Sequence, residues 1–295
     1  RNLHEGSCMM AQQQSIVSRV VETNRNLGLV IALAVVMIGF GIAAPSFASS
    51  ENLFAVLHAM GPSTLAASGM ALIILTGKID ISLGSIAFLS ASIGAMLMEA
   101  SWSPLSGFIA ILALGAGLGA VNGILVAYLR INSLIATLGT MMAFRGIGLM
   151  LTDARVIPLP ETMRAAANLT IGPVFVETLV VLAIATGVHA LHRATGFGRS
   201  LTAVGNSEEI AAKVGLNTKA ILFVTFVLAG ALASLAACSS FIQVGSVSGF
   251  LGKGMEFNAI AICVVGGISL AGGRGRIVPG VLIGAAAFQM ISNGL

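Results

Sequence analysis

Charged residues are scarce in this chain of 295 residues, where Asp, Glu, Lys and Arg together make up 9%. Soluble globular proteins carry about 25% charged and about 45–50% apolar residues, whereas 57% of this chain is apolar. The shortage of charge excludes an ordinary water-soluble domain and a disordered chain. The 15 basic residues outnumber the 11 acidic ones but form no basic patch, so we expect no nucleic-acid partner.

Cysteine, aromatic residues and catalytic motifs are also scarce. The three cysteines, Cys8, Cys238 and Cys263, have no CxxC spacing, which excludes a disulfide framework and a metal site. No Ser/His/Asp triad, carboxylate pair or HExxH motif is present, so we expect no catalytic residues, no metal and no cofactor. The phosphate-binding motif GxxxxGK[ST] is absent as well. With one Trp and one Tyr, the chain is poorly equipped to hold a sugar tightly by itself.

Long runs of apolar residues make up most of the sequence. A membrane-spanning helix needs about 20 consecutive, mostly apolar residues. They predict an all-α fold, a polytopic transmembrane helix bundle with about nine spans of a probable ten. The predicted spans are 27–44, 56–76, 81–98, 104–128, 131–151, 173–192, 218–238, 256–272 and 277–295. The first run is too long for a signal peptide and is preceded by a long polar stretch.

The two ends suggest a chain that differs from its natural extent. It begins at Arg1 rather than Met, so we expect 1–8 to be an upstream extension of a start at Met9 or Met10. It ends at Leu295 inside an apolar run, so we expect a further span beyond it. The domain prediction is a cytoplasmic N-terminal tail over 1–26 and a transmembrane domain over 27–295.

The distribution of basic residues predicts the orientation, because cytoplasmic loops are enriched in Lys and Arg. With the N-terminus in the cytoplasm, 11 of the 15 Lys and Arg residues fall on the inner side and three on the outer side. Arg145 lies within a span. The long polar stretch over 193–217 is then a cytoplasmic loop.

Glycine spacing predicts close packing of helices. Gly115, Gly119 and Gly123 repeat every four residues, and so do Gly280 and Gly284. Lipid provides no hydrophobic drive between helices, so helices associate through small residues that let their backbones approach. We therefore predict a structural role for these glycines.

A candidate site lies between the second and third runs, over 76–85. Lys78 and Asp80 stand there with almost no loop, and Gly77 and Gly84 flank them. Ionisable groups at membrane depth are usually paired or functional, and a broken helix is tolerated where it is buried or lines a cavity. The segment is therefore either a functional helix break or an interfacial turn with hydrated charges. A second glycine-rich break is expected over 266–276.

Polar residues inside the runs extend this candidate site. Arg145 should face the bundle interior, with Asp153 or backbone carbonyls near Gly146 and Gly148 as partners. Uncharged polar residues in the spans either line a hydrophilic path or bond across helices. The candidates for a solute path are Asp80, Ser82, Ser85, Asn122, Arg145 and Asn258.

The cytoplasmic loop contains a candidate docking helix over 206–215. Asn206 suits the N-cap, Glu209 suits the capping-box position, and Gly215 suits the residue that ends a helix. The helix either docks a partner or is an interfacial connector. The candidate coupling residues are Asn206, Glu208, Glu209, Ala211, Ala212 and Gly215.

Four blocks in order resemble the membrane-spanning permease subunits of ribose-type ABC sugar importers. The first, over 76–85, is similar to the family's TGGIDLSVGS, except that Lys78 replaces the second glycine. The second, over 137–146, contains Arg145; the third lies over 197–216 and the fourth over 259–275. Residues 1–26 carry no block of the family.

This resemblance implies the activity and the partners. It implies a permease in the bacterial inner membrane that imports a monosaccharide or related small polar solute. Its partners would be cytoplasmic ATP-binding subunits, a periplasmic or lipid-anchored sugar-binding protein, and a second copy or a paralogue. The helix over 206–215 would transmit ATPase closure to the spans. The alternative is a stand-alone secondary carrier or channel, and the choice of solute stays open.

Overall fold

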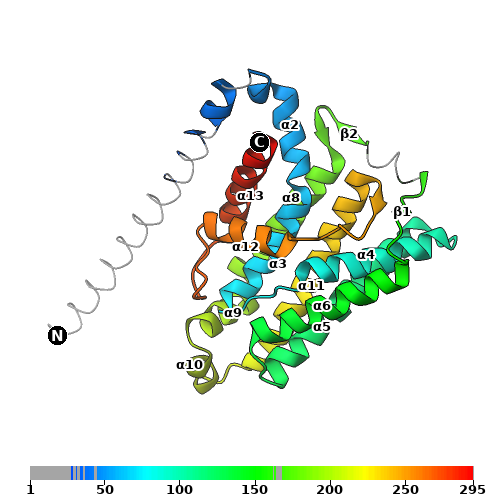
Figure 1. Cartoon of the computed structure of the whole chain (residues 1–295). Coiled ribbons are helices and arrows are strands. Elements are labelled where there is room, and N and C mark those ends of the chain that lie inside the picture. The colour runs from blue at the N-terminus through cyan, green and yellow to red at the C-terminus, as the bar shows by residue number, and fades with distance from the viewer. Residues whose placement is uncertain are drawn as a thin grey trace.

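The computed structural model describes residues 45–161, 163 and 168–294, with 28, 31, 34, 35 and 37–42 before them. The expected tail over 1–26 therefore lies outside the described residues, as does much of the run over 27–44. The elements, numbered as in Figure 1, begin with η1 (Pro45–Ala48), α2 (Ser50–Ala59), α3 (Gly61–Leu75), α4 (Leu83–Glu99), α5 (Pro104–Gly123), the π-helical η2 (Ile124–Tyr128) and α6 (Ser133–Thr152).

The second half of the chain is also mostly helical. It contains β1 (Ile157–Pro158), β2 (Thr170–Ile171), β3 (Val174–Phe175), α8 (Val176–Ala194), α9 (Gly196–Asn206), α10 (Glu208–Lys213), α11 (Thr218–Val244), β4 (Ser246–Val247), α12 (Met255–Val265) and α13 (Ile277–Gly294). The strands form two antiparallel pairs, β1 with β4 and β2 with β3. The expected all-α bundle is thus confirmed, with two-residue strands at its edges.

The predicted spans can be compared with these helices one by one. By length and composition, five helices of the described chain can cross a membrane: 104–128, 133–152, 176–194, 218–244 and 277–294. The pair α2 and α3, bent by 43°, supplies a sixth, and α4 and α12 are shorter apolar helices. Together these account for eight of the nine predicted runs.

The run over 256–272 does not form one continuous helix. The helix α12 has 11 residues, which is about 16 Å at 1.5 Å per residue, against an apolar membrane core of about 30 Å. The chain leaves the helix at Gly266, and Gly267 adopts a φ of 80°. The expected glycine-rich break therefore ends the helix early.

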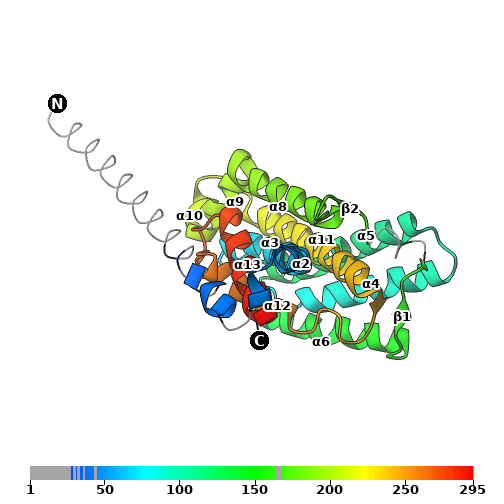
Figure 2. The same cartoon turned by 90° about the horizontal axis from the view of Figure 1, so that it is seen from above.

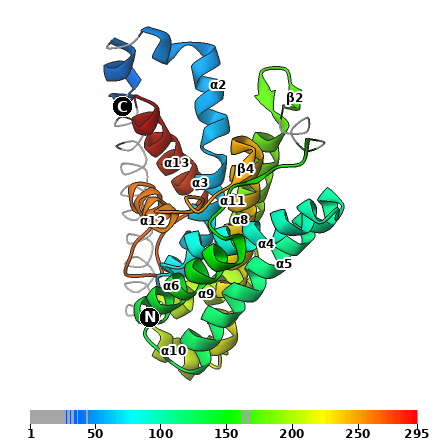
Figure 3. The same ribbon diagram turned by 45° about the vertical axis from the view of Figure 1, so that its right-hand side comes forward.

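The helix α3 is the centre of the bundle. Its sequence is apolar on all sides, which is typical of a helix buried in a protein, and 13 of its residues are buried. Seen from above, α8, α11, α12 and α13 surround it (Figure 2). The helix α10 lies at one end of the molecule, and the β2–β3 hairpin lies at the other (Figures 1 and 3).

The predicted role of the glycine repeats in close packing is confirmed. A Cβ atom on Gly115 or Gly119 would overlap the backbone of α11 at Gly230 or Phe226. In the same way, Gly280 and Gly284 lie directly against the backbone of α12. These contacts fix the framework that positions the site.

Candidate functional site

Asp80 lies in the non-helical segment between α3 and α4 and is completely buried. Its Oδ1 atom accepts hydrogen bonds from the Ser82 backbone N–H at 2.8 Å and the Ser82 hydroxyl at 2.6 Å. Its Oδ2 atom accepts one from Asn122 Nδ2 on α5 at 3.2 Å. Asn122 Nδ2 also donates to Ser82 Oγ at 2.7 Å. The break is therefore a closed polar network inside the bundle and not a hydrated turn.

Hydroxyl groups of α6 complete the hydrogen bonding of this break. Thr137 Oγ1 accepts from the Ile81 backbone N–H at 3.1 Å, and Ser133 Oγ accepts from that of Ile79 at 3.4 Å. Backbone that leaves the helix inside a membrane protein needs such partners. The sequence analysis did not single out Ser133 and Thr137 as site residues, because a hydroxyl on a helix gives no sign of its distant partner.

One polar atom of this network has no partner within the described part of the chain. It is Asn122 Oδ1, on a side chain that is fully buried. Buried polar atoms normally form hydrogen bonds. Asn122 is therefore the member of the network with spare hydrogen-bonding capacity, whereas both oxygens of Asp80 are engaged.

Arg145 on α6 lies beside the same segment, but its partners differ from those predicted. Its guanidinium donates to the carbonyls of Leu251 at 2.8 Å, Gly249 at 3.4 Å and Gly84 at 3.4 Å. Its Cζ atom lies 4.6 Å from the centroid of the Phe88 ring. The expected partner Asp153 instead caps the end of α6 in a left-handed conformation and is exposed. The loop before α12 returns to Arg145 in space, which spacing along α6 could not reveal.

Glu256 is a site residue that the sequence analysis missed. It is buried near the start of α12 and interacts electrostatically with Arg145. A Cβ atom on Gly84 would overlap both its carboxylate and the Gly252 carbonyl. Glu256 stood at the edge of a predicted span, where an acidic residue is unremarkable, so only the fold shows its position.

The other two solute-path candidates are placed less directly. Ser85 is buried in the first turn of α4, and its backbone N–H donates to the Ser82 carbonyl at 2.8 Å. Asn258 lies half-buried on α12, and within the described chain its side chain forms no hydrogen bond to this network. The structure thus brings together Asp80, Ser82 and Asn122, places Ser85 and Arg145 next to them, and leaves Asn258 apart.

The predicted docking helix exists, but its start differs from the prediction. The helix α9 continues through Asn206, so Ser207, with extended backbone, is the N-cap of α10, and its hydroxyl accepts from Ile210 N–H. Asn206 as N-cap is therefore wrong. Gly215 ends the helix as expected. It has a φ of 87°, and the N–H groups of Gly215 and Leu216 bond to Ala212 and Ala211, which is the Schellman pattern.

The two faces of α10 are different. Ala211 is buried against Ala127, Val204 and Leu222, so it anchors the helix. Ile210 and Val214, one turn apart, are 63% and 71% exposed. Glu208, Glu209 and Ala212 are exposed as well. A small apolar surface with acidic neighbours therefore points away from the bundle.

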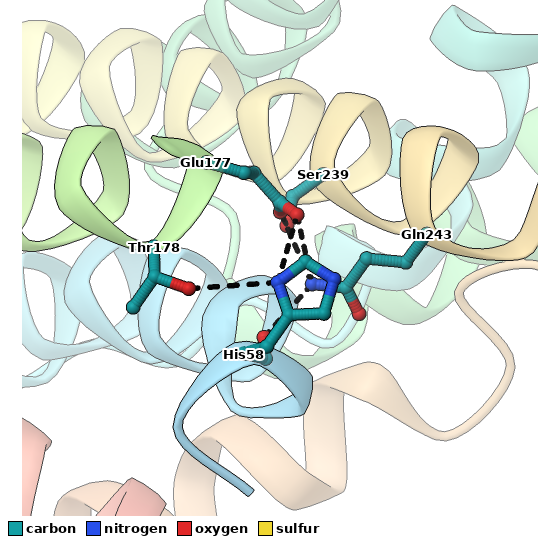
Figure 4. A network of polar contacts seen from close by, with 5 residues as sticks. All are labelled: His58, Glu177, Thr178, Ser239 and Gln243. Atoms are coloured by element: carbon teal, nitrogen blue, oxygen red, sulfur yellow. Dashed lines mark hydrogen bonds and ion pairs between the residues drawn. The ribbon is translucent and has the colours of Figure 1, made fainter. Parts of the chain in front are cut away.

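A second polar network joins α2, α8 and α11 (Figure 4). Glu177 on α8 lies 3.4 Å from His58 Nδ1 on α2 and accepts hydrogen bonds from Ser239 and Gln243 on α11. Gln243 Nε2 also donates to the His58 carbonyl at 2.9 Å. Pro62, four residues after His58, has no N–H to offer that carbonyl. Gln243 therefore supplies the bond that is missing at the bend between α2 and α3.

An apolar bundle in which five or six helices can span a membrane is typical of a polytopic membrane protein. The family described as branched-chain amino acid transport system permease component matches residues 52–295. The chain therefore belongs to this family of permease components.

Two curated relatives from Escherichia coli support this assignment. The chain is 36% identical over 279 residues to the autoinducer 2 import system permease protein LsrC of strain K12 / DH10B, covering 94% of this chain and 81% of the relative. It is 36% identical over 274 residues to the ribose import permease protein RbsC of strain K12, covering 90% and 84%. The resemblance to ribose-type ABC importer permeases is thus confirmed. No solved structure matches the chain.

Proposed function

We propose that this chain is the membrane-spanning subunit of an ABC importer for a monosaccharide or a related small polar solute. It supplies the path, and separate ATP-binding subunits supply the energy. The observation that carries this proposal is the buried network of Asp80, Ser82 and Asn122 at the helix break. The relatives import ribose and autoinducer 2, which supports a polar solute of that size.

The residues of the network have different roles in this proposal. Asp80 fixes the break, because both of its oxygens accept hydrogen bonds from neighbouring residues. Asn122 faces the solute path when the spans rearrange, and its free Oδ1 accepts a hydrogen bond from a solute hydroxyl. Arg145 and Glu256 hold the loop before α12 against Gly84. In this proposal the solute also contacts Ser85, next to the network on α4, and Asn258, which lies apart from it on α12.

The partners follow from the two ends of the molecule. The chain lies in the bacterial inner membrane with its N-terminus and α10 in the cytoplasm, as the distribution of basic residues indicates. ATP-binding subunits dock on α10 through the exposed Ile210 and Val214. A periplasmic or lipid-anchored binding protein delivers the solute to the other end. A second copy of this chain, or a paralogue, completes the membrane domain.

The Asp80→Asn variant should keep its abundance in the membrane and lose most of its uptake. Asn keeps the shape of Asp but offers one acceptor oxygen instead of two, so the break loses part of its hydrogen bonding; a change of about 1.4 kcal/mol at this site corresponds to a roughly tenfold loss of uptake. Uptake of labelled ribose in a strain lacking the native permease measures the loss, and quantification of the permease in the membrane measures abundance. Asp153→Asn is the control, because Asp153 is exposed and Asn tolerates its left-handed backbone. Full uptake by Asp80→Asn at normal abundance would refute the proposed role.

The Ile210→Glu variant should no longer bind the ATP-binding subunit. It places a charge in the small apolar surface of α10, 63% exposed at Ile210, while Ala211 continues to anchor the helix. Co-purification of the two subunits measures the effect. Val244→Glu, at an equally exposed position at the far end of α11, should leave co-purification unchanged. Normal co-purification with Ile210→Glu would show that the ATP-binding subunit contacts a part of the permease other than this surface of α10.

A further inference from the structure

Three segments meet backbone to backbone at the end of the molecule that carries α10. They are the turn over 76–78, the α9–α10 corner over 205–208 and the loop over 271–273. Gly273 N–H donates to the Leu75 carbonyl at 3.0 Å, and a Cβ atom on Gly205 would overlap that same carbonyl. Gly272 likewise lies against the backbone of Gly205 and Gly77, and the Asn206 side chain packs against Gly273. Because packed protein interiors transmit displacement, a shift of the corner must move the turn.

Lys78 makes the side-chain link across this junction. Its Nζ atom lies 3.1 Å from Oε2 of Glu208, the first residue of α10. Lys78 is also only two residues before Asp80 in the helix break. One ion pair therefore joins the start of α10 directly to the segment that carries the buried carboxylate.

The surroundings favour this pair over other pairings. Both residues line a pocket of about 810 Å³ beneath α10, together with Arg130, Glu209 and Lys213. Lys213 is paired with Glu209 one turn away on α10 itself, at 2.7 Å. The side chains of Lys78 and Glu208 are 29% and 47% exposed. A pair this accessible adds little to stability, so the fold does not depend on it.

We propose that Lys78 and Glu208 are a positioning pair that transmits displacement of α10 to the Asp80 break. This inference rests on the proposed function, in which α10 receives the ATP-binding subunits. When those subunits move α10, the pair and the glycine contacts pull the turn over 76–78 with it. Coupling between two sites arises when one element takes part in both, and the Lys78 turn is that element here.

A charge swap tests the pair in the complete transporter with its ATP-binding subunits. Lys78→Glu and Glu208→Lys, taken singly, place like charges together and should each lower uptake per ATP hydrolysed by at least about fivefold, the low end of coupling between sites. Co-purification of the ATP-binding subunit should be unchanged in Lys78→Glu, because Lys78 lies outside α10. The double variant restores the opposite charges and should recover most of the uptake. Arg155→Glu is the control, since Arg155 forms a comparably exposed pair with Glu99 at 2.8 Å elsewhere in the molecule.

The outcomes separate the pair from the proposed function. Normal uptake per ATP in both single variants, or a double variant no better than the single ones, overturns the pair even if transport by the unaltered protein depends on ATP. Uptake by the unaltered protein that needs no ATP-binding subunit overturns the proposed function, and the pair with it. An equal loss of uptake per ATP in the Arg155→Glu control also overturns the proposed role of the Lys78–Glu208 pair, because any reversed surface charge would then have the same effect.

Discussion

Replacing Gly84 by alanine should abolish most of the transport, since its added Cβ atom would overlap backbone. Gly84 is the second residue of α4, and the new atom would collide with the Gly252 carbonyl and the Glu256 carboxylate. Overpacking typically costs about 1–3 kcal/mol, and a backbone neighbour cannot move aside as a flexible side chain does. The loop before α12 must shift, and Arg145 then loses its acceptors at Gly84, Gly249 and Leu251.

We expect Gly84→Ala to lower uptake by about tenfold, equivalent to about 1.4 kcal/mol, and to lower the thermal unfolding midpoint by several degrees. Gly146→Ala is the matched control, because a Cβ atom there meets nothing within 4 Å. In a helix interior that change removes a glycine penalty of about 1 kcal/mol, so the control should be as stable as the parent or more so. Equal behaviour of the two variants would show that the close approach at Gly84 is unimportant.

Replacing Glu177 by leucine should destabilise the protein strongly through the network that joins α2, α8 and α11. Glu177 is the shared acceptor for His58, Ser239 and Gln243, which come from two other helices. The side chains of His58 and Glu177 are only 19% and 13% exposed. Removing this acceptor leaves the Ser239 hydroxyl and one N–H of Gln243 without their partner, and an unsatisfied buried polar group costs about 1–3 kcal/mol.

The thermal unfolding midpoint in detergent measures this effect. Glu177→Leu should lower it clearly, whereas Glu177→Gln, which keeps an acceptor oxygen, should lower it less. Glu161→Leu, at an exposed position, should leave it unchanged. An unaltered midpoint for Glu177→Leu would mean that the bend between α2 and α3 is held by apolar packing alone.

Local features of the fold were predictable from the sequence. Apolar runs located the helices, because burial in lipid or protein demands a long apolar stretch whatever its partners are. Gly115 and Gly119 predicted close helix contact, because only a missing side chain allows it. Gly215 predicted the end of α10, because a left-handed residue at that point favours glycine. Each of these signals depends on neighbours within a few turns.

The features that sequence reasoning missed depend on distant partners. Asp80 and Asn122 are 42 residues apart, and Arg145 and Leu251 are 106 apart. A pattern along one helix contains no information on which loop returns to it. The same limit explains why the prediction of Asn206 as an N-cap was wrong. Asn206 is a good N-cap residue, but it is the last residue of the preceding helix α9. The helix break at Asp80 was predictable, whereas the hydrogen-bond partners of Asp80 were not.

Reconstitution of the purified permease into proteoliposomes tests the central claim most directly. Labelled solute uptake is measured with the permease alone, and then with its ATP-binding and solute-binding partners, with ATP supplied on the side that α10 faces. We predict no accumulation by the permease alone and ATP-dependent accumulation by the complete assembly, and Ile210→Glu should abolish the accumulation by the complete assembly. Accumulation by the permease alone would contradict the account and identify the chain as a stand-alone carrier.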